Sequence, residues 1–319
     1  MQSFKISIFS LIFVLVILIS AIHYRVDIKN SIILDIASGS STSSIATSLH
    51  ENKIILNPTI FKIYVRLSSN DHKFKAGEYK FKSTQSIHSI VDKLTKGDFF
   101  YRKLTLLPGS TISNILELGN SEGLINDLVT DPEKLLKKKG ITLQEGIFFP
   151  DTFFYLKGEN FSSILIKSYE KWKKISKDLW INRNLNLPFK NLNEAVTLAS
   201  IIEKEGLEKR KIAGVFVNRL NKNMKLQSDP TVIYALGNEF DGNLTRKNLR
   251  IDNPYNTYRY RGLPPGPISI VSYDSLEAAL NPLLTDYLYF VSMGNGFHKF
   301  SKTLTEHNEA VLKYQINDR

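Results

Sequence analysis

The chain has 319 residues, of which 42% are hydrophobic, so it is long enough for one large or two smaller domains and is not a disordered chain. It contains no cysteine, which excludes a disulfide, a thiolate nucleophile and a cysteine-based metal site. The formal net charge of +11 indicates an anionic partner, and charge alone leaves nucleic acid, acidic phospholipid and an anionic cell-wall polymer open.

Residues 6–22 form an uncharged, mostly apolar run. As a helix, this run would span roughly 26 Å, enough to cross a bilayer with slight thinning. The segment 20–23 is a poor cleavage site for a signal peptidase, which favours a retained anchor over a cleaved signal peptide. We therefore expect residues 1–25 to form a cytoplasmic tail and transmembrane anchor, with the rest of the chain exported to a compartment where nucleic acid is scarce.

Residues 26–105 are predicted to form a small module of strand, helix, helix and strand. The apolar pattern indicates a strand over 31–36, then a Ser- and Gly-rich turn and a helix that carries Leu49 on its apolar face. A second helix is expected over 58–67, and a second strand begins at Gly77.

Residues 106–319 mix helices and strands without regular alternation, which favours an α+β class. Helices are expected over 193–205 and 208–220, with Gly206 as the break between them, and residues around 294–296 are typical of a β-hairpin turn. The chain has no phosphate loop, dinucleotide fingerprint, zinc-protease motif or nucleophile elbow, and its six histidines lack ligand-like spacing. We therefore expect no cofactor and no metal.

The stretch LASIIEKEG, residues 198–206, contains the first candidate for catalysis. In a helix, Glu203 shares a face with Ala199 and Ser200, where poor hydration would raise its pKa toward neutrality, as a general acid requires. Glu205 points about 200° further around the helix and is expected to stay in solvent. These nine residues leave open the alternative that Glu203 is an ordinary solvated charge at a helix end.

Two later segments, 215–237 and 253–269, are rich in amides, aromatic rings, proline and glycine. Such loops suit sugars, because hydroxyl groups need planar hydrogen-bonding partners and the C–H faces of sugars stack on rings; turn chemistry with core tyrosines is the alternative. Asp229 is a candidate second carboxylate, although its place before Pro230 favours a helix cap. His298, in the predicted hairpin, fits a ligand contact or, more simply, a structural role.

Five segments stand out in chain order: EGIFFPDTFFY from Glu145, LASIIEKE from Leu198, VFVNRLNKNMKLQSDPTVIYALG from Val215, YNTYRYRGLPPGPIS from Tyr255 and YLYFVSMGNGFHKFS from Tyr287. They resemble successive motifs of the YceG-like endolytic murein transglycosylases (MltG), in the same order over most of residues 105–310. The predicted strand-helix-helix-strand module also resembles the LysM-like subdomain of that family. One departure is visible: residues 270–272 are Ile-Val-Ser, where the family commonly has Asn-Pro-Gly.

The resemblance implies an α+β protein with a single N-terminal transmembrane helix (1–25), a small LysM-like βααβ module (26–105) and a larger mixed α+β catalytic domain (106–319). It implies a single-pass protein of the bacterial inner membrane whose catalytic domain lies on the periplasmic or extracellular side. The implied activity cleaves the MurNAc-GlcNAc β-1,4 bond of nascent peptidoglycan, forms 1,6-anhydroMurNAc ends and terminates glycan strand elongation. The implied partners are peptidoglycan glycan strands and the inner membrane, with peptidoglycan synthases as further candidates and no nucleic acid.

By the same resemblance, Glu203 is the catalytic acid, which protonates the glycosidic oxygen and then accepts the proton of the MurNAc C6 hydroxyl. Arg219 would meet an anionic group of the substrate or brace the fold. Two alternatives stay open. The first is a glycan hydrolase that uses Glu203 and Asp229, and the second is a non-catalytic, membrane-tethered peptidoglycan-binding protein. The side chains expected to contact the glycan are Arg219, Gln227, Asp229, Tyr255 and Asn256.

Overall fold

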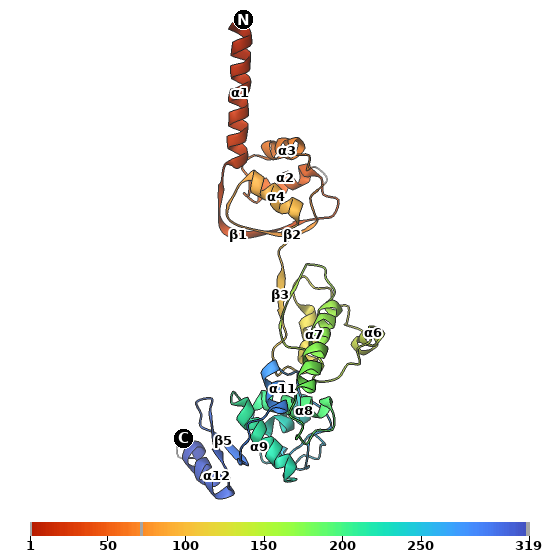
Figure 1. Ribbon diagram of the computed structural model, residues 1–319. Coiled ribbons are helices and arrows are strands. Elements are labelled where there is room, and N and C mark those ends of the chain that lie inside the picture. Colours follow the sequence, from red (N-terminus) through yellow and green to blue (C-terminus); the bar gives the residue numbers. More distant parts are fainter. Residues whose placement is uncertain (1, 71–72, 317–319) are drawn as a thin grey trace. The chain divides into compact units, whose positions relative to one another are not determined.

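The computed structural model describes residues 2–70 and 73–316, so Met1 of the expected anchor segment lies outside the described residues. The chain divides into two compact units, shown in Figure 1. Unit 1 is Met1–Arg102 with Phe154–Glu159, and unit 2 is Lys103–Phe153 with Asn160–Arg319. The sequence places this boundary near residue 105. Helices and small sheets occur in both units, which confirms the α+β class.

Helix α1 (Gln2–His23) contains the apolar N-terminal run. Many large apolar side chains of this helix are exposed, including Phe9 and Phe13. Among the residues that the structure describes, none of the helices combines the length and the apolar character needed to cross a membrane. The transmembrane helix expected over 6–22 therefore stays a prediction.

Unit 1 continues with β1 (Val26–Ile36), α2 (Thr42–Glu51), α3 (Pro58–Leu67), β2 (Gly77–Gln85) and α4 (Ile87–Lys96). The first four elements have the predicted order of strand, helix, helix and strand. Strands β1 and β2 pair antiparallel, with an irregularity in register in the first half of β1. The three helices cover this two-stranded sheet with apolar faces and form the core of the unit.

Local capping chemistry sets the start of α3 at the predicted residue. The side chain of Asn57 accepts hydrogen bonds from the backbone N–H groups of Thr59 and Ile60, and Pro58 occupies the first helical position. Phe61, on the apolar face of this helix, is fully buried in the core of unit 1.

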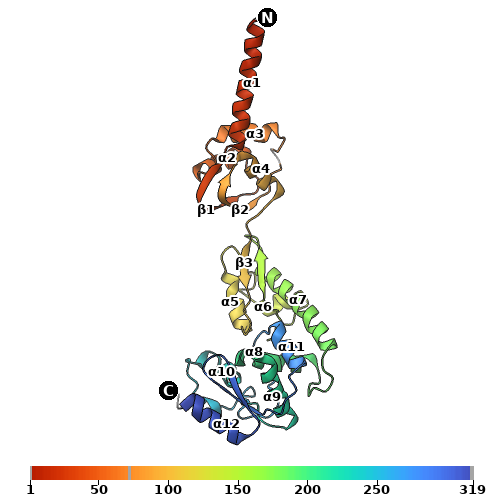
Figure 2. The same ribbon diagram turned by 60° about the vertical axis from the view of Figure 1, so that its left-hand side comes forward.

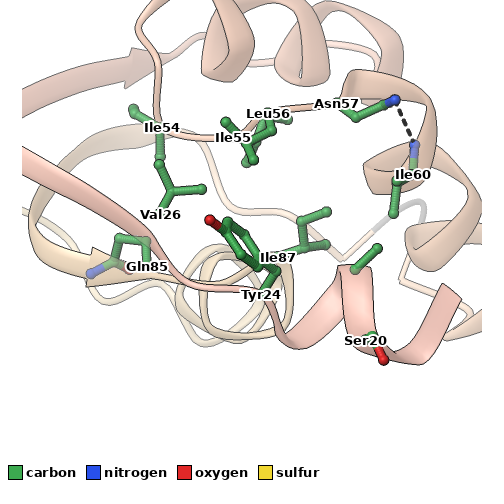
Figure 3. Close-up of a pocket in the computed structure, with 11 residues that line it drawn as sticks. Ser20, Tyr24, Val26, Ile54, Ile55, Leu56, Asn57, Ile60, Gln85 and Ile87 are labelled. Carbon is green, nitrogen blue, oxygen red and sulfur yellow. Dashed lines mark hydrogen bonds between the residues drawn. The ribbon is translucent and has the colours of Figure 1, made fainter. Parts of the chain in front are cut away.

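An apolar cavity of about 270 Å³ lies in unit 1, between the end of α1 and the loop before α3 (Figure 3). Ile54, Ile60 and Ile87 are among the side chains that line it, and the polar group of Asn57 is already engaged by the N–H of Ile60. Tyr24 is the one ionisable side chain in its lining. Among the described residues that line this cavity, none is an aspartate, glutamate, histidine, lysine or arginine.

The boundary between the two units falls within β3 (Arg102–Thr105) and within β4 (Thr152–Tyr155). Unit 2 contains α5 (Ile112–Glu117), α6 (Pro132–Lys138) and α7 (Phe161–Ile181). Strands β3 and β4 pair in a second two-stranded sheet. Short helical turns also occur in the described part of unit 2: η1 (Leu118–Asn120), η2 (Gly237–Glu239), η3 (Asn248–Arg250) and the π-helical η4 (Leu312–Ile316).

The core of unit 2 is helical. Helices α8 (Leu192–Glu205), α9 (Lys209–Asn221) and α11 (Tyr273–Leu280) contact one another, and α10 (Asp229–Leu236) also packs on α8. Figures 1 and 2 show α8, α9 and α11 side by side in both views. The eight consecutive residues 195–202 of α8 are all buried, so this helix is covered on every side over two turns.

The C-terminal elements are β5 (Tyr289–Ser292), β6 (His298–Ser301) and α12 (Leu304–Val311). Strands β5 and β6 pair antiparallel, with Phe290 opposite Phe300, which confirms the predicted hairpin around residues 294–296. Helix α12 packs against both strands, and β5 contacts α9.

Candidate active site

Helix α8 carries Glu203, the predicted acid, and Glu205 at its C-terminal end. Asn191 caps the start of the helix by accepting the backbone N–H of Glu194, and the helix ends at Glu205, next to the predicted break at Gly206. Because α9, α10 and α11 surround this helix, the neighbours of each carboxyl group depend on which of these elements it faces.

The carboxyl group of Glu203 lies in a polar setting. One oxygen accepts from Lys209 Nζ at 3.0 Å, and the other accepts from the backbone N–H and Oγ of Ser272 at 2.8 and 2.6 Å. Burial raises the pKa of Glu203, but these donors, together with Ser275, outweigh burial and hold the pKa below its ordinary value. The expectation that poor hydration would raise the pKa of Glu203 is therefore wrong. An ionised, ion-paired carboxylate has no proton to donate.

Ser272 belongs to the segment in which this chain departs from the family pattern. Its Oγ also accepts the backbone N–H of Ser275 and so caps α11. Two residues earlier, the N–H of Ile270 donates to the carbonyl of Ser110, and its own carbonyl accepts the N–H of Gly109. Glu203 thus connects α8 to α9 through Lys209 and to α11 through Ser272, which is a structural arrangement.

Glu205 lies in the opposite kind of setting. Its side chain lines a cavity and is otherwise enclosed by protein, and one oxygen accepts a hydrogen bond from Ser228 Oγ. Burial raises the pKa of Glu205 to about 7; the Ser228 hydrogen bond and Arg219 oppose this effect, whereas the carboxylate of Asp229 adds to it. Glu205 is thus substantially protonated near neutral pH. The expectation that Glu205 is an ordinary solvated charge is wrong.

The cavity that Glu205 lines has a volume of about 600 Å³. Its wall includes residues just before and at the start of α10. The strands of the C-terminal hairpin and helix α12 also line it. Three of the predicted site residues, Arg219, Gln227 and Asp229, line the same cavity as Glu205. Other polar side chains in its wall are those of Tyr258, Tyr289, Ser292, His298, His307, Asn308 and Gln315.

Gln227 and Asp229 flank the start of α10. Gln227 is exposed and has a left-handed backbone with a φ of 51°, a conformation that is uncommon for residues other than glycine. Ser228, not Asp229, occupies the N-cap position of α10, so the interpretation of Asp229 as a cap is wrong. The Asp229 carboxylate instead accepts from the Tyr258 hydroxyl at 2.5 Å, and burial, with this bond, raises the pKa of Tyr258.

Arg219 is buried and braces the fold. Its guanidinium donates to the carbonyls of Leu288 at 2.6 Å and Leu226 at 2.7 Å, and it lies over the ring of Tyr289 at 5.3 Å. Burial lowers the pKa of this group, and the nearby tyrosines and Glu205 partly offset that effect. Of the two predicted roles, these contacts support bracing, and a contact with an anionic substrate group stays a prediction.

The structure does not bring Tyr255 and Asn256 to the cavity. Asn256 is fully buried, and its amide donates to the carbonyls of Leu249 and Ile251 while its oxygen accepts the N–H of Tyr258. Tyr255 packs on Tyr234 with ring centroids 4.8 Å apart. These two side chains shape the loop that carries Tyr258, and their placement lends no support to a direct glycan contact.

Sequence reasoning missed Glu205 although a signal was present. Glu205 lies three and four positions after Ile202 and Ile201, and residues at these spacings share a helix face. At the same spacings Glu203 follows Ala199 and Ser200, which are smaller and less apolar than the two isoleucines, so the apolar pattern favoured Glu205 as the more enclosed of the two carboxyl groups. Tyr258 lies within a segment that the sequence singled out, but nothing in its pattern marked it as the partner of Asp229.

The fold and the site define an α+β protein with a polar cavity built around one carboxyl group that titrates near neutral pH. Such a cavity suits acid catalysis on a polar, extended ligand. The chain belongs to the YceG-like family, whose family model matches residues 34–313.

Named relatives and solved structures are similar to this chain. An endolytic murein transglycosylase of Bacillus subtilis is 35% identical over 312 residues, which cover 90% of this chain and 86% of the relative. Endolytic murein transglycosylases of two Streptococcus pneumoniae strains are 27% identical, and the match covers 90% of this chain and 59% of each relative. The crystal structure of a YceG-like protein from Listeria monocytogenes has a TM-score of 0.53 and 35% identity, covering 88% of this chain and 99% of that one.

Proposed function

We propose that this chain is an endolytic lytic transglycosylase that cleaves the MurNAc-GlcNAc β-1,4 bond of nascent peptidoglycan and thereby terminates glycan strand elongation. The observation that carries the proposal is Glu205, a carboxyl group whose pKa is raised to about 7 in a polar cavity of about 600 Å³. Membership of the YceG-like family and the names of the relatives support the same reaction and substrate.

In this proposal Glu205 takes the role that the sequence resemblance assigned to Glu203. The protonated carboxyl group of Glu205 donates its proton to the glycosidic oxygen while the bond from that oxygen to C1 of MurNAc breaks. As C1 acquires oxocarbenium-like character, the Glu205 carboxylate accepts the proton of the C6 hydroxyl, and the C6 oxygen bonds to C1. The product has a 1,6-anhydro end, no water is consumed, and Glu205 regains its proton.

The neighbours of Glu205 suit this use of a single carboxyl group. Ser228 Oγ donates to one carboxyl oxygen and so fixes the orientation of the group. The charge of Asp229 contributes to the raised pKa of Glu205, which keeps the proton available near neutral pH. A hydrolase would instead need Asp229 to direct a water molecule or to form a covalent intermediate; one oxygen of this carboxylate accepts the Tyr258 hydroxyl.

The products of digestion distinguish the two reactions. When isolated peptidoglycan is digested with the purified protein, every new MurNAc end should be lighter by one water than a hydrolysed reducing end, as measured by mass spectrometry. Hydrated reducing ends would identify a glycan hydrolase. Sacculi that bind the protein but release no fragments would identify a non-catalytic peptidoglycan-binding protein.

The setting of the enzyme is part of the proposal. A retained N-terminal anchor would hold the protein in the bacterial inner membrane as a single-pass protein, with unit 2 on the periplasmic or extracellular side. Unit 1 would serve as a LysM-like module, supported by its order of strand, helix, helix and strand. The net charge of +11 favours anionic surfaces of this compartment, and peptidoglycan synthases are candidate partners.

A further inference from the structure

His298 lies in the wall of the cavity that contains Glu205, and its position is tightly fixed. Its side chain is 8% exposed, and its ring packs edge-on against Phe290 with centroids 5.3 Å apart. A Cβ atom added to Gly206 would lie 2.7 Å from His298 Cε1, closer than real Cβ contacts come. The imidazole therefore rests directly on the backbone of the residue that follows Glu205.

The two ring nitrogens of His298 have different surroundings. Nδ1 is buried and has no hydrogen-bond partner, and it lies 3.6 Å from an oxygen of Glu208, beyond hydrogen-bond distance. Because Nδ1 is enclosed, Nε2 is the nitrogen that the cavity can reach. A buried polar atom without a partner is unusual enough to require an explanation, such as a group that moves closer when a ligand binds.

Glu208 is held where it can orient the ring. One of its oxygens accepts the backbone N–H of His298 at 2.8 Å, and the other accepts from Lys211 Nζ at 2.8 Å. A carboxylate beside Nδ1 favours the tautomer that carries its hydrogen on Nδ1, as a carboxylate does in other carboxylate-histidine pairs. In this tautomer the lone pair of Nε2 faces the cavity and can accept a hydrogen bond.

We propose that His298 is a substrate-binding residue: its Nε2 accepts a hydrogen bond from a hydroxyl group of the glycan strand, and Glu208 is the positioning residue that sets its tautomer. The identity of the ligand rests on the proposed function. Sugar hydroxyls are hydrogen-bond donors and are plentiful along a glycan. The C-terminal hairpin then supplies one part of the wall of the glycan site. Gln227 and Asp229, which lie about 70 positions earlier in the chain, supply another part.

A purely structural histidine would fill space among Phe290 and Phe300 and make no contact with ligand. Two substitutions separate these roles. His298→Phe keeps a flat aromatic ring in this cluster but removes both nitrogens. His298→Gln loses the ring but places an amide oxygen near the position of Nε2, where it can accept the same hydrogen bond.

The test measures binding rather than turnover. Each substitution is introduced into full-length protein that also carries Glu205→Gln, and the affinity for soluble, uncross-linked peptidoglycan glycan strands is measured by calorimetry. We expect the His298→Phe protein to bind roughly threefold to tenfold more weakly than the Glu205→Gln parent, the loss of one neutral hydrogen bond. The His298→Gln protein should bind with an affinity within about twofold of that of the parent, a smaller difference than the loss of one hydrogen bond typically produces.

Equal affinity of the parent and the His298→Phe protein would overturn the proposal, as would equal losses in the Phe and Gln proteins. Glu208→Gln tests the positioning role of Glu208, because it keeps an acceptor for the backbone N–H of His298 but removes the charge. We expect this variant to bind strands more weakly than the parent. Unchanged affinity would refute the positioning role. Should the parent itself still cleave strands, the assignment of Glu205 as the acid fails while the His298 comparison stands. A parent that binds no strands would overturn both proposals.

Discussion

The ionisation of Glu205 should leave a measurable mark on the stability of the protein. The pKa of this group is about 7 in the folded protein and 4.5 as its ordinary value. At 1.36 kcal/mol per pKa unit, this difference corresponds to about 3 kcal/mol. Because the pKa is raised on folding, the folded state binds more protons than the unfolded state between the two values. The stabilisation that protonated Glu205 contributes is therefore fully present below its ordinary pKa, and it is lost as the pH rises through its folded-state pKa.

Glu205→Gln removes this loss. Glutamine cannot ionise, and its Oε1 can still accept the hydrogen bond from Ser228 Oγ. The free energy of unfolding, measured by urea titration at a series of pH values from about 4.5 to about 8, should fall in the wild type relative to the variant. The gap between them should widen by about 3 kcal/mol over this range. A gap that stays constant with pH would refute the reasoning that the fold holds this carboxyl group in its protonated form.

The remaining predictions concern neighbouring parts of unit 2. Glu203→Gln should lower the free energy of unfolding near neutral pH by about 2 kcal/mol, because it removes the charged acceptor of Lys209 and Ser272. This effect should shrink as the pH falls through the lowered pKa of Glu203, and a variant as stable as the wild type at neutral pH would contradict the prediction. Gly214→Ala should destabilise the protein by roughly 1–3 kcal/mol in the same titration, because the new Cβ would lie 2.4 Å from the carbonyl oxygen of Leu283, and an unchanged urea midpoint would count against it. The rate of strand cleavage under kcat/KM conditions should fall about tenfold per pH unit above the Glu205 pKa of about 7, whereas a rate that keeps rising would exclude a protonated acid.

Those parts of the fold that depend on local chemistry could be predicted from the sequence. The start of α3 follows from Asn57 and Pro58, whose cap and fixed φ act within one turn. The C-terminal hairpin follows from alternating apolar residues around a glycine turn. The break after α8 follows from Gly206, a glycine that interrupts the apolar helical pattern.

The choice between Glu203 and Glu205 could not be made from local chemistry alone. The pKa of each group depends first on its burial and then on a partner that is distant in sequence: Ser272, 69 positions from Glu203, and Ser228, 23 positions from Glu205. Similarly, Asn256 has the composition of a glycan contact but is used by the backbone carbonyls of its own loop. Such partners are set by how α9, α10 and α11 pack around α8, which residue spacing along one helix does not reveal.

Cleavage of isolated peptidoglycan by two matched variants tests the central claim most directly. Glu205→Gln and Glu203→Gln each replace a glutamate by a glutamine, and the two residues lie two positions apart on α8. Mass analysis of the released fragments should show 1,6-anhydro ends from the wild type and, at a reduced rate, from any folded Glu203→Gln protein, but none from Glu205→Gln. Anhydro products from Glu205→Gln, together with none from a folded Glu203→Gln protein, would contradict the account and return the acid to Glu203.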